Sequence, residues 1–547
     1  MNSDGGVSMH LTLIETSSNQ RYIFATNKLR ENVGASELTH RVGTAFVRDA
    51  VRGITGATQP ARVEDGARVE VIMATSGKAL LLTRERDTAR HIVREVTLAA
   101  LEAAPGLDVA GVVGEEFDWG RDSLDEQVGR VHVLFEQQRA RRPSPALRFL
   151  RLPVVAPCAT SGLPAATYDA GGPEPGLRSA VALAKRDHTR LGLDRIAALL
   201  PELRLPRSIE ELERRFEDLD WLGVVHADGN GVGEILLRFG QHVGARDAAG
   251  NRRYADALRC FSADLDECCL AAFRDALPVL PAQRARDRPL FPAVPLVLGG
   301  DDLTLVCDGR WALPFAEAFL RAFERETAGR AAVRDVARAA LGREALSACA
   351  GVAIVKTHFP FHLAYELAEE LLRSAKTVKT HVTRDGVPWP VTSALDFHVL
   401  FDASGSRLAD VRADLAPEGA RLLARPYVVT APDALGDADG RDWCERHHWS
   451  RLAQRVAALR RPSAEDATRP ALPRSQTHWL REGLFLGRDE ADARLGLIRS
   501  RYEQDFGPLV QERDGRPSLF WTEGDGCETG LLDAMEATEF LGHGELA

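Results

Sequence analysis

The sequence predicts an α+β protein, and three observations support this fold class. Short β-type runs bounded by turn residues alternate with longer segments in which apolar residues recur at helical spacing. The order strand, helices, hairpin, helix, strand occurs in residues 1–140 and again in residues 220–385. Residues 141–219 connect these two units, and residues 386–547 contain mainly helical and irregular patterns. We therefore predict two related α+β domains, a linker and a mainly helical C-terminal domain.

The first unit begins with a predicted strand at 10–15, which a helical segment follows. A hairpin pattern at 69–83, a helix at 88–104 and a short strand at 109–113 complete it. In the connector, proline and glycine are dense from residue 142 to residue 176, which indicates loops, since both residues interrupt regular elements. Helical patterns follow in the rest of the connector.

The second unit repeats this order with clearer signals. A strand at 221–227 leads into a glycine-rich turn and helices up to residue 277, and a hairpin occupies 294–307. A helix at 313–326, a strand at 350–356 and a helix at 361–380 follow. The last helix has Leu363, Leu367, Leu371 and Ala375 at four-residue spacing, which predicts one buried face.

The composition is that of a globular protein with a sizeable core. Of the 547 residues, 45% are hydrophobic and 27% are charged, and the net charge is −10. A surface that coats nucleic acid is normally basic, so this charge argues against such a surface but permits a local basic groove. Apolar runs stay well short of the roughly 20 residues that span a bilayer, and the N-terminal segment lacks the pattern of a signal peptide. We expect a cytoplasmic protein without a membrane partner.

The cysteines and lysines are few and scattered. None of the eight cysteines forms a CxxC pair, which argues against a zinc ribbon or a redox motif and indicates a reducing compartment. Only six of the 69 basic residues are lysines, so their positions are informative: Lys28, Lys78, Lys185, Lys356, Lys376 and Lys379.

Two adjacent carboxylates lie at the tip of a very apolar hairpin. In the stretch PLVLGGDDLTLVCDG, residues 295–309, Gly299 and Gly300 provide turn chemistry and Asp301 and Asp302 follow them. Solvated turn residues are one interpretation. A divalent-metal site is the other, and a third carboxylate favours it.

That third carboxylate is Asp228, at the end of the first strand of the same unit. It is 73 residues before Asp301, which leaves room for the intervening helices to bring the two strand ends together. Carboxylates gathered at such a place need a compensating cation, and hard oxygen ligands favour Mg²⁺ or Mn²⁺. We predict that Asp228, Asp301 and Asp302 form this metal site.

A nucleoside triphosphate could be bound beside these aspartates. The turn Gly229-Asn230-Gly231 would let phosphates approach the backbone, and the helix after it offers its positive end. Lys376 and Lys379 close the last helix of the unit and could neutralise phosphate charge. Their position near a helix C-terminus also has a purely structural explanation. EF-hand, dinucleotide-binding and Walker loop patterns fail on their spacing.

The motifs resemble the large polymerase–cyclase subunit of type III CRISPR effector complexes. The resemblance is carried by VVHADGNGVG, VLGGDDLTLVCDG and GVAIVKTHFPFHLAYELAEELLRSAK in this order, and by QRYIFATNKLRENVGASEL near the N-terminus. It covers roughly the first 380 residues. It implies two palm domains of the ferredoxin-like type, the second of which carries the GGDD motif, and the conversion of ATP into cyclic oligoadenylate second messengers in antiviral defence.

The resemblance also implies roles for individual residues. Asp228, Asp301 and Asp302 would hold two Mg²⁺ or Mn²⁺ ions. Gly299 and Gly300 would let the ribose and triphosphate of ATP approach, Lys376 would contact the triphosphate, and Ser262 would lie near the adenine. Effector subunits of the complex, a guide RNA and a target RNA would be partners.

Two departures from the family limit what we expect. The chain contains no His-Asp dipeptide, so we do not expect the nuclease activity of the HD domain that the family often carries. Where the family has a zinc-binding insertion, Cys158 is alone, and one thiolate cannot complete a tetrahedral zinc site. We predict no structural zinc and treat residues 141–219 as a linker with a metal-free remnant.

Three functions are compatible with these residues. The first is two-metal nucleotidyl transfer, in which the first unit, whose hairpin turn has no carboxylate, supplies a second nucleotide pocket. The second is a scaffold subunit of a CRISPR ribonucleoprotein, which can coexist with the first. The third is a dinucleotide cyclase outside CRISPR. A homodimer of the diguanylate-cyclase kind is disfavoured because a second palm is already present in the chain.

Overall fold

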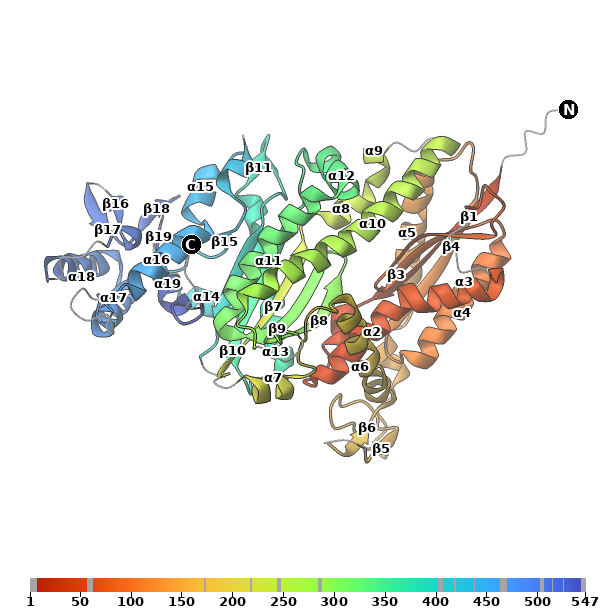
Figure 1. Ribbon diagram of the computed structural model, residues 1–547, viewed down its shortest axis with the longest axis horizontal. Helices are drawn as coiled ribbons and strands as arrows, with labels where there is room; N and C mark the ends of the chain where they lie inside the picture. Colours follow the sequence, from red (N-terminus) through yellow and green to blue (C-terminus); the bar gives the residue numbers. More distant parts are fainter. Residues whose placement is uncertain are drawn as a thin grey trace.

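A computed structural model of the chain describes most of its length, in an elongated arrangement with the two units side by side and the C-terminal region at the far end (Figure 1). Among the described residues, no helix is both long and apolar enough to cross a membrane. The described residues are 7–56, 62–171, 174–216, 219–243, 247–283, 288–401, 407–417, 420–436, 438–462, 470–501, 506–513, 515–524 and 526–542.

The first unit is a four-stranded antiparallel sheet with helices against both faces. Its strand order is β2-β3-β1-β4, with β1 (Ser8–Ser17) and β3 (Lys78–Thr83) in the middle. Side chains on alternate positions of β1 enter two different cores, because successive residues of a strand point to opposite faces. The other elements are β2 (Val69–Thr75), β4 (Asp108–Asp118), α1 (Asn19–Ile23), α2 (Leu29–Arg41), α3 (Val47–Thr55), α4 (Arg86–Ala103) and α5 (Leu124–Arg141).

The connector ends in a long helix that packs along the first unit. This helix, α6 (Ala180–Leu199), runs beside α2, and ion pairs join Arg186 to Glu31 (2.8 Å) and Arg195 to Glu37 (2.7 Å). Before it lies the small hairpin of β5 (Thr167–Asp169) and β6 (Gly176–Arg178), and after it α7 (Ile209–Arg215) leads to the second unit.

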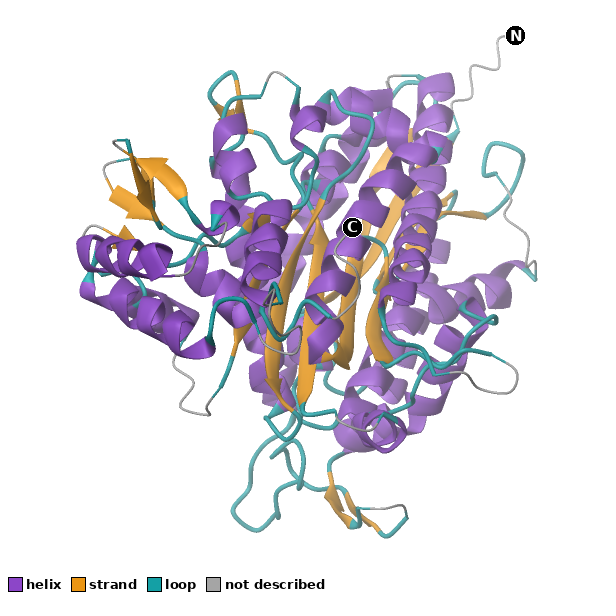
Figure 2. Cartoon of the chain, turned by 60° about the vertical axis from the view of Figure 1, so that its left-hand side comes forward, coloured by secondary structure: helices purple, strands orange, loops and turns teal. Residues whose placement is uncertain are grey.

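The second unit repeats the strand order of the first in a larger sheet. The order β8-β9-β7-β10 corresponds to β2-β3-β1-β4, so the repeat that the sequence predicts is present. The strands are β7 (Trp221–Gly229), β8 (Ala293–Gly299), β9 (Asp302–Asp308) and β10 (Ala348–Lys356). Figure 2 shows these strands between layers of helices, as expected for an α+β protein. This class, predicted from the sequence, is confirmed.

Two helices cover one face of this sheet and a third covers the other. The helices α10 (Ala248–Ala276) and α11 (Gly309–Gly329) share a core with one face, and α13 (Phe361–Ala375) packs on the opposite face. Shorter elements complete the unit: α8 (Val232–Leu237), α9 (Phe239–Val243), α12 (Ala331–Leu341) and the 3₁₀ helix η4 (Lys376–Thr380).

The second sheet continues past residue 385, which the sequence did not predict. Strand β13 (Ala394–Val399) pairs with β10 in parallel, and β15 (Tyr427–Val428) adds to the edge of β13. Every residue of β10 except its last is buried. This strand lies between β7 and β13, and its side chains enter the cores on both faces of the sheet. The C-terminal region is therefore joined to the second unit by a shared sheet.

Helices dominate the remaining C-terminal region, but strands are present as well. The helices are α14 (Leu408–Asp414), α15 (Arg441–Arg446), α16 (Trp449–Arg460), α17 (Arg474–Leu486), α18 (Arg488–Arg501) and α19 (Leu531–Ala537). The strands are β11 (Thr383–Arg384), β12 (Val387–Pro388), β14 (Ala420–Arg421), β16 (Gln511–Arg513), β17 (Arg516–Ser518), β18 (Trp521–Glu523) and β19 (Gly526–Glu528).

A buried cluster in this region has ligand types that could hold a metal ion. Atoms of His447, Glu523 and Glu528 lie within 4.8 Å of one another, and His447 and Glu528 are each only 1% exposed. The charged helical segment that contains His447 and His448 predicts a surface position for both, and this prediction is wrong, since they are 1% and 8% exposed. Arg446 contacts Glu523 at 3.0 Å and Arg421 contacts Glu528 at 3.5 Å. Since an arginine contacts each of the two carboxylates, we interpret the cluster as a structural polar network.

Candidate active site

The end of β7 and the β8–β9 hairpin meet at one edge of the second sheet. Strands β7 and β9 are antiparallel, and Ala227 pairs with Leu303. One step further along this register, Asp228 lies opposite Asp302, where Cα atoms of paired residues are about 5 Å apart. In the hairpin, Gly299 pairs with Asp302, so Gly300 and Asp301 form a two-residue turn.

The turn conformation and the strand end both depend on glycine. Gly300 has φ of 64°, in the left-handed region that glycine adopts without cost. At the end of β7, a Cβ atom on Gly229 would lie 2.6 Å from Asp301 Oδ2, and the Gly229 N–H donates a hydrogen bond to the Asp301 carboxylate. Because Gly229 has no side chain, Asp301 can lie directly against the end of β7.

The three aspartates lie at one end of the sheet but do not point to a single spot. Among the described residues, the oxygens of Asp228, Asp301 and Asp302 do not form a set within 4.8 Å of one another. Asp228 and Asp302 are in register on one face, whereas Asp301 turns to Gly229. Lys376 donates a hydrogen bond to Asp228 Oδ2 and so places an ammonium group beside this carboxylate.

Crowding and burial make the carboxylates of the turn poor anions. The pKa of Asp301 is raised to about 7, first by burial and then by the charge of Asp302. Burial also raises the pKa of Asp302, although the nearby His226 ring acts in the opposite direction. Such shifts mark a place where a cation would be favourable, because a cation would restore the charged form of both groups.

The donor set fits a hard divalent ion. Asp228, Asp301 and Asp302 offer oxygen only, which is the ligand type that Mg²⁺ and Mn²⁺ prefer. The two neighbouring soft or nitrogen ligands are already engaged. Cys269 donates its S–H to the Asp302 carbonyl oxygen at 3.6 Å, and His226 Nδ1 lies 3.0 Å from the Thr304 hydroxyl.

A cavity of about 250 Å³ opens beside Asp228 on the side away from the hairpin. Lys376 and Lys379 supply positive charge to it, and its wall includes Thr392, whose buried hydroxyl has no hydrogen-bond partner within the described part of the chain. The lining residues are Asn230, Gly231, Glu234, Cys349, Lys376, Lys379, Pro388, Trp389, Pro390 and Thr392. Phosphate oxygens could accept from these lysines and from the Thr392 hydroxyl.

Of the residues predicted to bind nucleotide, Asn230 has a structural explanation. Its side-chain amide donates to Ser347 Oγ at 2.9 Å and to the Thr392 carbonyl oxygen at 3.0 Å, and its backbone N–H donates to Ser347. These bonds join the turn after β7 to the segments before β10 and β13. The neighbouring Gly231 faces the cavity.

Ser262 lies on α10, and so does Asp266, an aspartate that the sequence analysis missed and that contacts the hairpin tip. Ser262 is partly buried, one helical turn before Asp266. The Gly300 N–H donates a hydrogen bond to Asp266 Oδ1, and burial raises the pKa of Asp266. The only signal in the sequence was the spacing of four residues between Ser262 and Asp266, which places them on one helix face.

No protein-family model matches the chain, and no curated protein matches it.

Solved structures do share its fold. A chain of the Csm1–Csm4 cassette in complex with AMPPNP matches with a TM-score of 0.52 and 15% identity, over 99% of this chain and 71% of that chain. The cassette in complex with pppApApA matches with a TM-score of 0.51 and 16% identity, over 98% and 71%. For the cassette in complex with cA4 the TM-score is 0.50 at 16% identity, over 97% and 70%.

These structural neighbours are Csm1 subunits of type III CRISPR Csm complexes. At such low identity the likeness shows the fold and leaves the activity open. The resemblance that the sequence motifs indicated is confirmed at this level.

Proposed function

We propose that the chain is a nucleotidyltransferase that joins ATP into cyclic oligoadenylates, or related cyclic nucleotides, as a subunit of a type III CRISPR complex. The observation that carries the proposal is the placement of Asp228, Asp301 and Asp302 at one sheet end, beside a lysine-lined cavity. Two further facts support it: the chain has the fold of Csm1, and solved Csm1–Csm4 cassettes are in complex with AMPPNP, pppApApA and cA4.

In this proposal both units are palm domains of the ferredoxin-like type. The palms span residues 1–140 and 220–385, the linker 141–219 and the C-terminal domain 386–547. The identical strand order of the two sheets supports it, since β-α-β-β-α-β is the order of this fold. Domain boundaries follow the sequence analysis, although the second sheet extends into the C-terminal part.

The residues of the second unit have distinct tasks in the reaction. Asp228, Asp301 and Asp302 would hold two divalent ions, which when bound lower the pKa of a 3′-hydroxyl and neutralise the charge of the leaving pyrophosphate. Lys376 and Lys379 bind the triphosphate in the cavity. Lys376 exchanges its contact with Asp228 for phosphate oxygens, and this leaves the carboxylate free for a cation.

The first unit would hold the second nucleotide. Helix α1 of the first unit comes close to the proposed catalytic centre, because the side-chain amide of Gln20 lies 3.5 Å from His226 Nε2. Phe24 stacks on Tyr365 of α13 with ring centroids 3.6 Å apart. Two nucleotides at this junction would face each other, as the joining of a 3′-hydroxyl to an α-phosphate requires.

Subunits of the complex are proposed partners. The structural neighbours occur in cassettes of Csm1 with Csm4, which favours a Csm4-like subunit as a partner of this chain. A guide RNA and a target RNA would then belong to the assembly, and the scaffold role would accompany the catalytic one.

The proposed activity is tested with purified protein, ATP and Mn²⁺. We expect 3′–5′ linked adenylates, which mass spectrometry and chromatography identify together with their ring size. The double substitution Asp301→Ala with Asp302→Ala should reduce the rate at least about a thousandfold, since it removes most of the ion-binding charge.

Thermal unfolding checks that the variant is folded. Removing two crowded carboxylates should leave the melting temperature unchanged or raise it, because their burial costs free energy in the absence of ions. Equal product formation by the wild type and the double variant would place catalysis elsewhere in the chain.

A further inference from the structure

One side of α10 carries three charged residues at intervals of seven. Arg252, Arg259 and Asp266 are separated by two helical turns each, so they lie along one stripe of the helix. From the first to the last, the stripe is about 21 Å long at 1.5 Å per residue. Sequence spacing of this kind usually marks a buried apolar seam, and here it carries charge.

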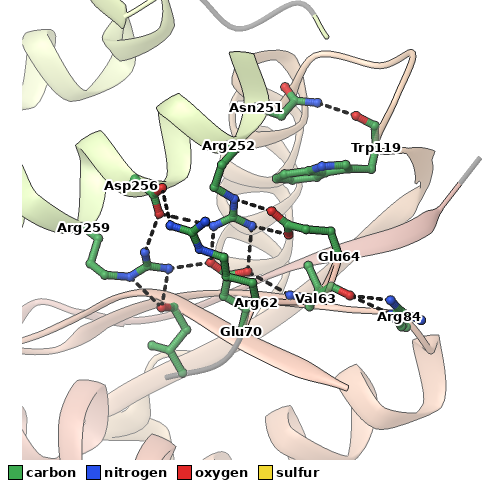
Figure 3. A network of polar contacts seen from close by, with 11 residues as sticks. Arg62, Val63, Glu64, Glu70, Arg84, Trp119, Asn251, Arg252, Asp256 and Arg259 are labelled. Atoms are coloured by element: carbon green, nitrogen blue, oxygen red, sulfur yellow. Dashed lines mark hydrogen bonds and ion pairs between the residues drawn. The ribbon is translucent and has the colours of Figure 1, made fainter. Parts of the chain in front are cut away.

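The first two residues of the stripe, Arg252 and Arg259, contact the edge strand β2 of the first unit (Figure 3). Arg252 contacts Glu70 of β2 at 2.7 Å and Glu64 at 2.6 Å, and Arg259 also bonds to Glu70. Glu70 is only 2% exposed. The adjacent Asn251 is fully buried. The buried, multiply bonded ion pair between Arg252 and Glu70 fixes the position of α10 relative to β2.

Asn251 adds three hydrogen bonds to the same junction. Its amide donates to the carbonyl oxygens of Trp119 and Asp122 at 2.9 and 2.7 Å, and its Oδ1 accepts from the Leu124 N–H at 2.8 Å. Every bond ends on the backbone of the first unit. The N-terminal half of α10, although part of the second unit, is therefore bonded directly to the first unit.

The second half of the stripe touches the proposed metal-binding turn. Asp266 Oδ1 accepts from the Gly300 N–H, and it lies 3.4 Å from the place a Cβ atom on Gly299 would occupy. One turn later Cys269 contacts the Asp302 carbonyl oxygen at 3.6 Å. Two side chains of one rigid helix thus hold both ends of the turn that presents Asp301.

We propose that Asp266 is a positioning residue for the Gly299–Asp302 turn. We further propose that α10, which contacts both β2 and this turn, couples the position of the turn to the position of β2. A carboxylate bond to a backbone N–H is stronger than a neutral one, and it acts on the residue in the left-handed conformation, Gly300. The catalytic consequence rests on the proposed function. The conformational claim does not, because it concerns the turn alone.

Three variants of α10 test the proposal in the full chain. Asp266→Ala removes the acceptor, Asp266→Asn keeps an acceptor oxygen without the charge, and Asp264→Ala is the matched control. Asp264 lies two residues earlier on the helix and faces Arg330 at 3.8 Å. Amide hydrogen exchange of a peptide covering residues 298–303, with Mn²⁺ binding by calorimetry, measures the turn without any need for turnover.

Asp266→Ala should speed exchange of this peptide and weaken Mn²⁺ binding, each by about tenfold, which is the size of one charged hydrogen bond. Asp266→Asn should stay within about threefold of wild type, and Asp264→Ala should match it. In ATP turnover, Asp266→Ala should lower kcat with little change in the KM for ATP, since Asp266 is not part of the lysine-lined cavity.

Unchanged exchange in Asp266→Ala would overturn the proposal. Slow exchange in Asp266→Asn with Mn²⁺ affinity as poor as in Asp266→Ala would also overturn it, because the charge would then act as a metal ligand. A wild type that makes no adenylates would contradict the proposed function, while the exchange data would still decide whether Asp266 holds the turn.

Discussion

The two units share their strand order and differ in charge at the tips of equivalent hairpins. In the first unit, Glu15 at the end of β1 pairs in register with Lys78, the first residue of β3. In the second unit, the same positions are Asp228 and Asp302. A carboxylate–lysine pair in one unit thus corresponds to two carboxylates in the other.

The two hairpin tips therefore differ in the charge that they gather. Lys78 Nζ lies 3.0 Å from Glu15 Oε2 and 3.1 Å from His132 Nε2, so the first tip is neutralised by its own side chains. At the second tip Lys376 meets Asp228, while Asp301 and Asp302 have raised pKa values. One tip is closed by an ion pair, whereas the other gathers carboxylates whose charged form a cation would favour.

The two hairpin turns are also anchored differently. The turn of the first unit is held by its own sheet, where the Thr16 N–H and hydroxyl donate to the Gly77 carbonyl oxygen at 2.8 and 3.1 Å. The turn of the second unit is held from outside, by Asp266 of α10. A turn held by a helix that also contacts the other unit can be placed relative to that unit, whereas the two bonds to Gly77 in the first turn come from its own sheet.

The largest effect on stability is expected where α10 joins the units. Glu70→Gln should cost about 3 kcal/mol of unfolding free energy, because it leaves Arg252 and Arg259 without their buried counter-charge. Denaturant unfolding followed by tryptophan fluorescence measures this cost. Glu64→Gln is the control, since Glu64 is more exposed and contacts Arg252 alone, and it should cost about 1 kcal/mol or less.

The effect of Glu70 should also depend on pH in a defined direction. Burial would raise its pKa, but the hydrogen bonds and charge of Arg252 outweigh burial and lower the pKa below the ordinary 4.5. The stabilisation is therefore complete above pH 4.5 and is lost as the pH falls through the lowered value. A gap between wild type and Glu70→Gln that stays constant down to strongly acidic pH would contradict this account.

The close approach at the second tip is tested by a glycine pair. Gly229→Ala should slow ATP turnover about a hundredfold, because the added Cβ would lie 2.6 Å from Asp301 Oδ2 and must displace it. Gly233→Ala, four residues later in α8, meets nothing within 4 Å and should leave the rate unchanged. Equal rates for both variants would show that Asp301 is not held in this position during catalysis.

The smallest expected effect is on the KM for ATP, and it distinguishes Lys376 from Lys78. Lys376→Met should raise the KM for ATP about tenfold, as expected for one lost phosphate contact. Lys78→Met should leave the KM within twofold and cost about 1 kcal/mol of stability or less. Similar KM increases in both variants would mean that both tips bind nucleotide phosphates directly.

Lys376 also predicts a pH dependence of nucleotide binding. Burial, helped by the charge of Lys379, lowers its pKa to about 8. Since a lysine loses its charge as the pH rises through its pKa, the KM of the wild type should rise above about pH 8. The KM of Lys376→Met should be flat in this range, and initial-rate measurements between pH 7 and 9.5 compare the two.

Local patterns in the sequence were sufficient for the α+β class, for the repeated order of elements and for the hairpin around Asp301. Alternating apolar residues and Gly-Gly turns are local signals, and they depend on neighbours a few positions away. The addition of β13 to the second sheet was missed, because a parallel partner in a sheet gives no local signal of where it pairs. The buried position of His447 was missed for a similar reason, since its partner Glu528 is 81 residues away.

Residue order alone shows which carboxylates are available, namely Asp228, Asp301 and Asp302, and that they lie at the ends of apolar strands. The folded chain was needed to show that Lys78 of the first unit occupies the position of Asp302 in the second, and that Asp266 contacts the turn. The physical reason is register: a shift of one residue between antiparallel strands changes every cross-strand pair, and helix packing on the sheet decides which distant side chain reaches the turn.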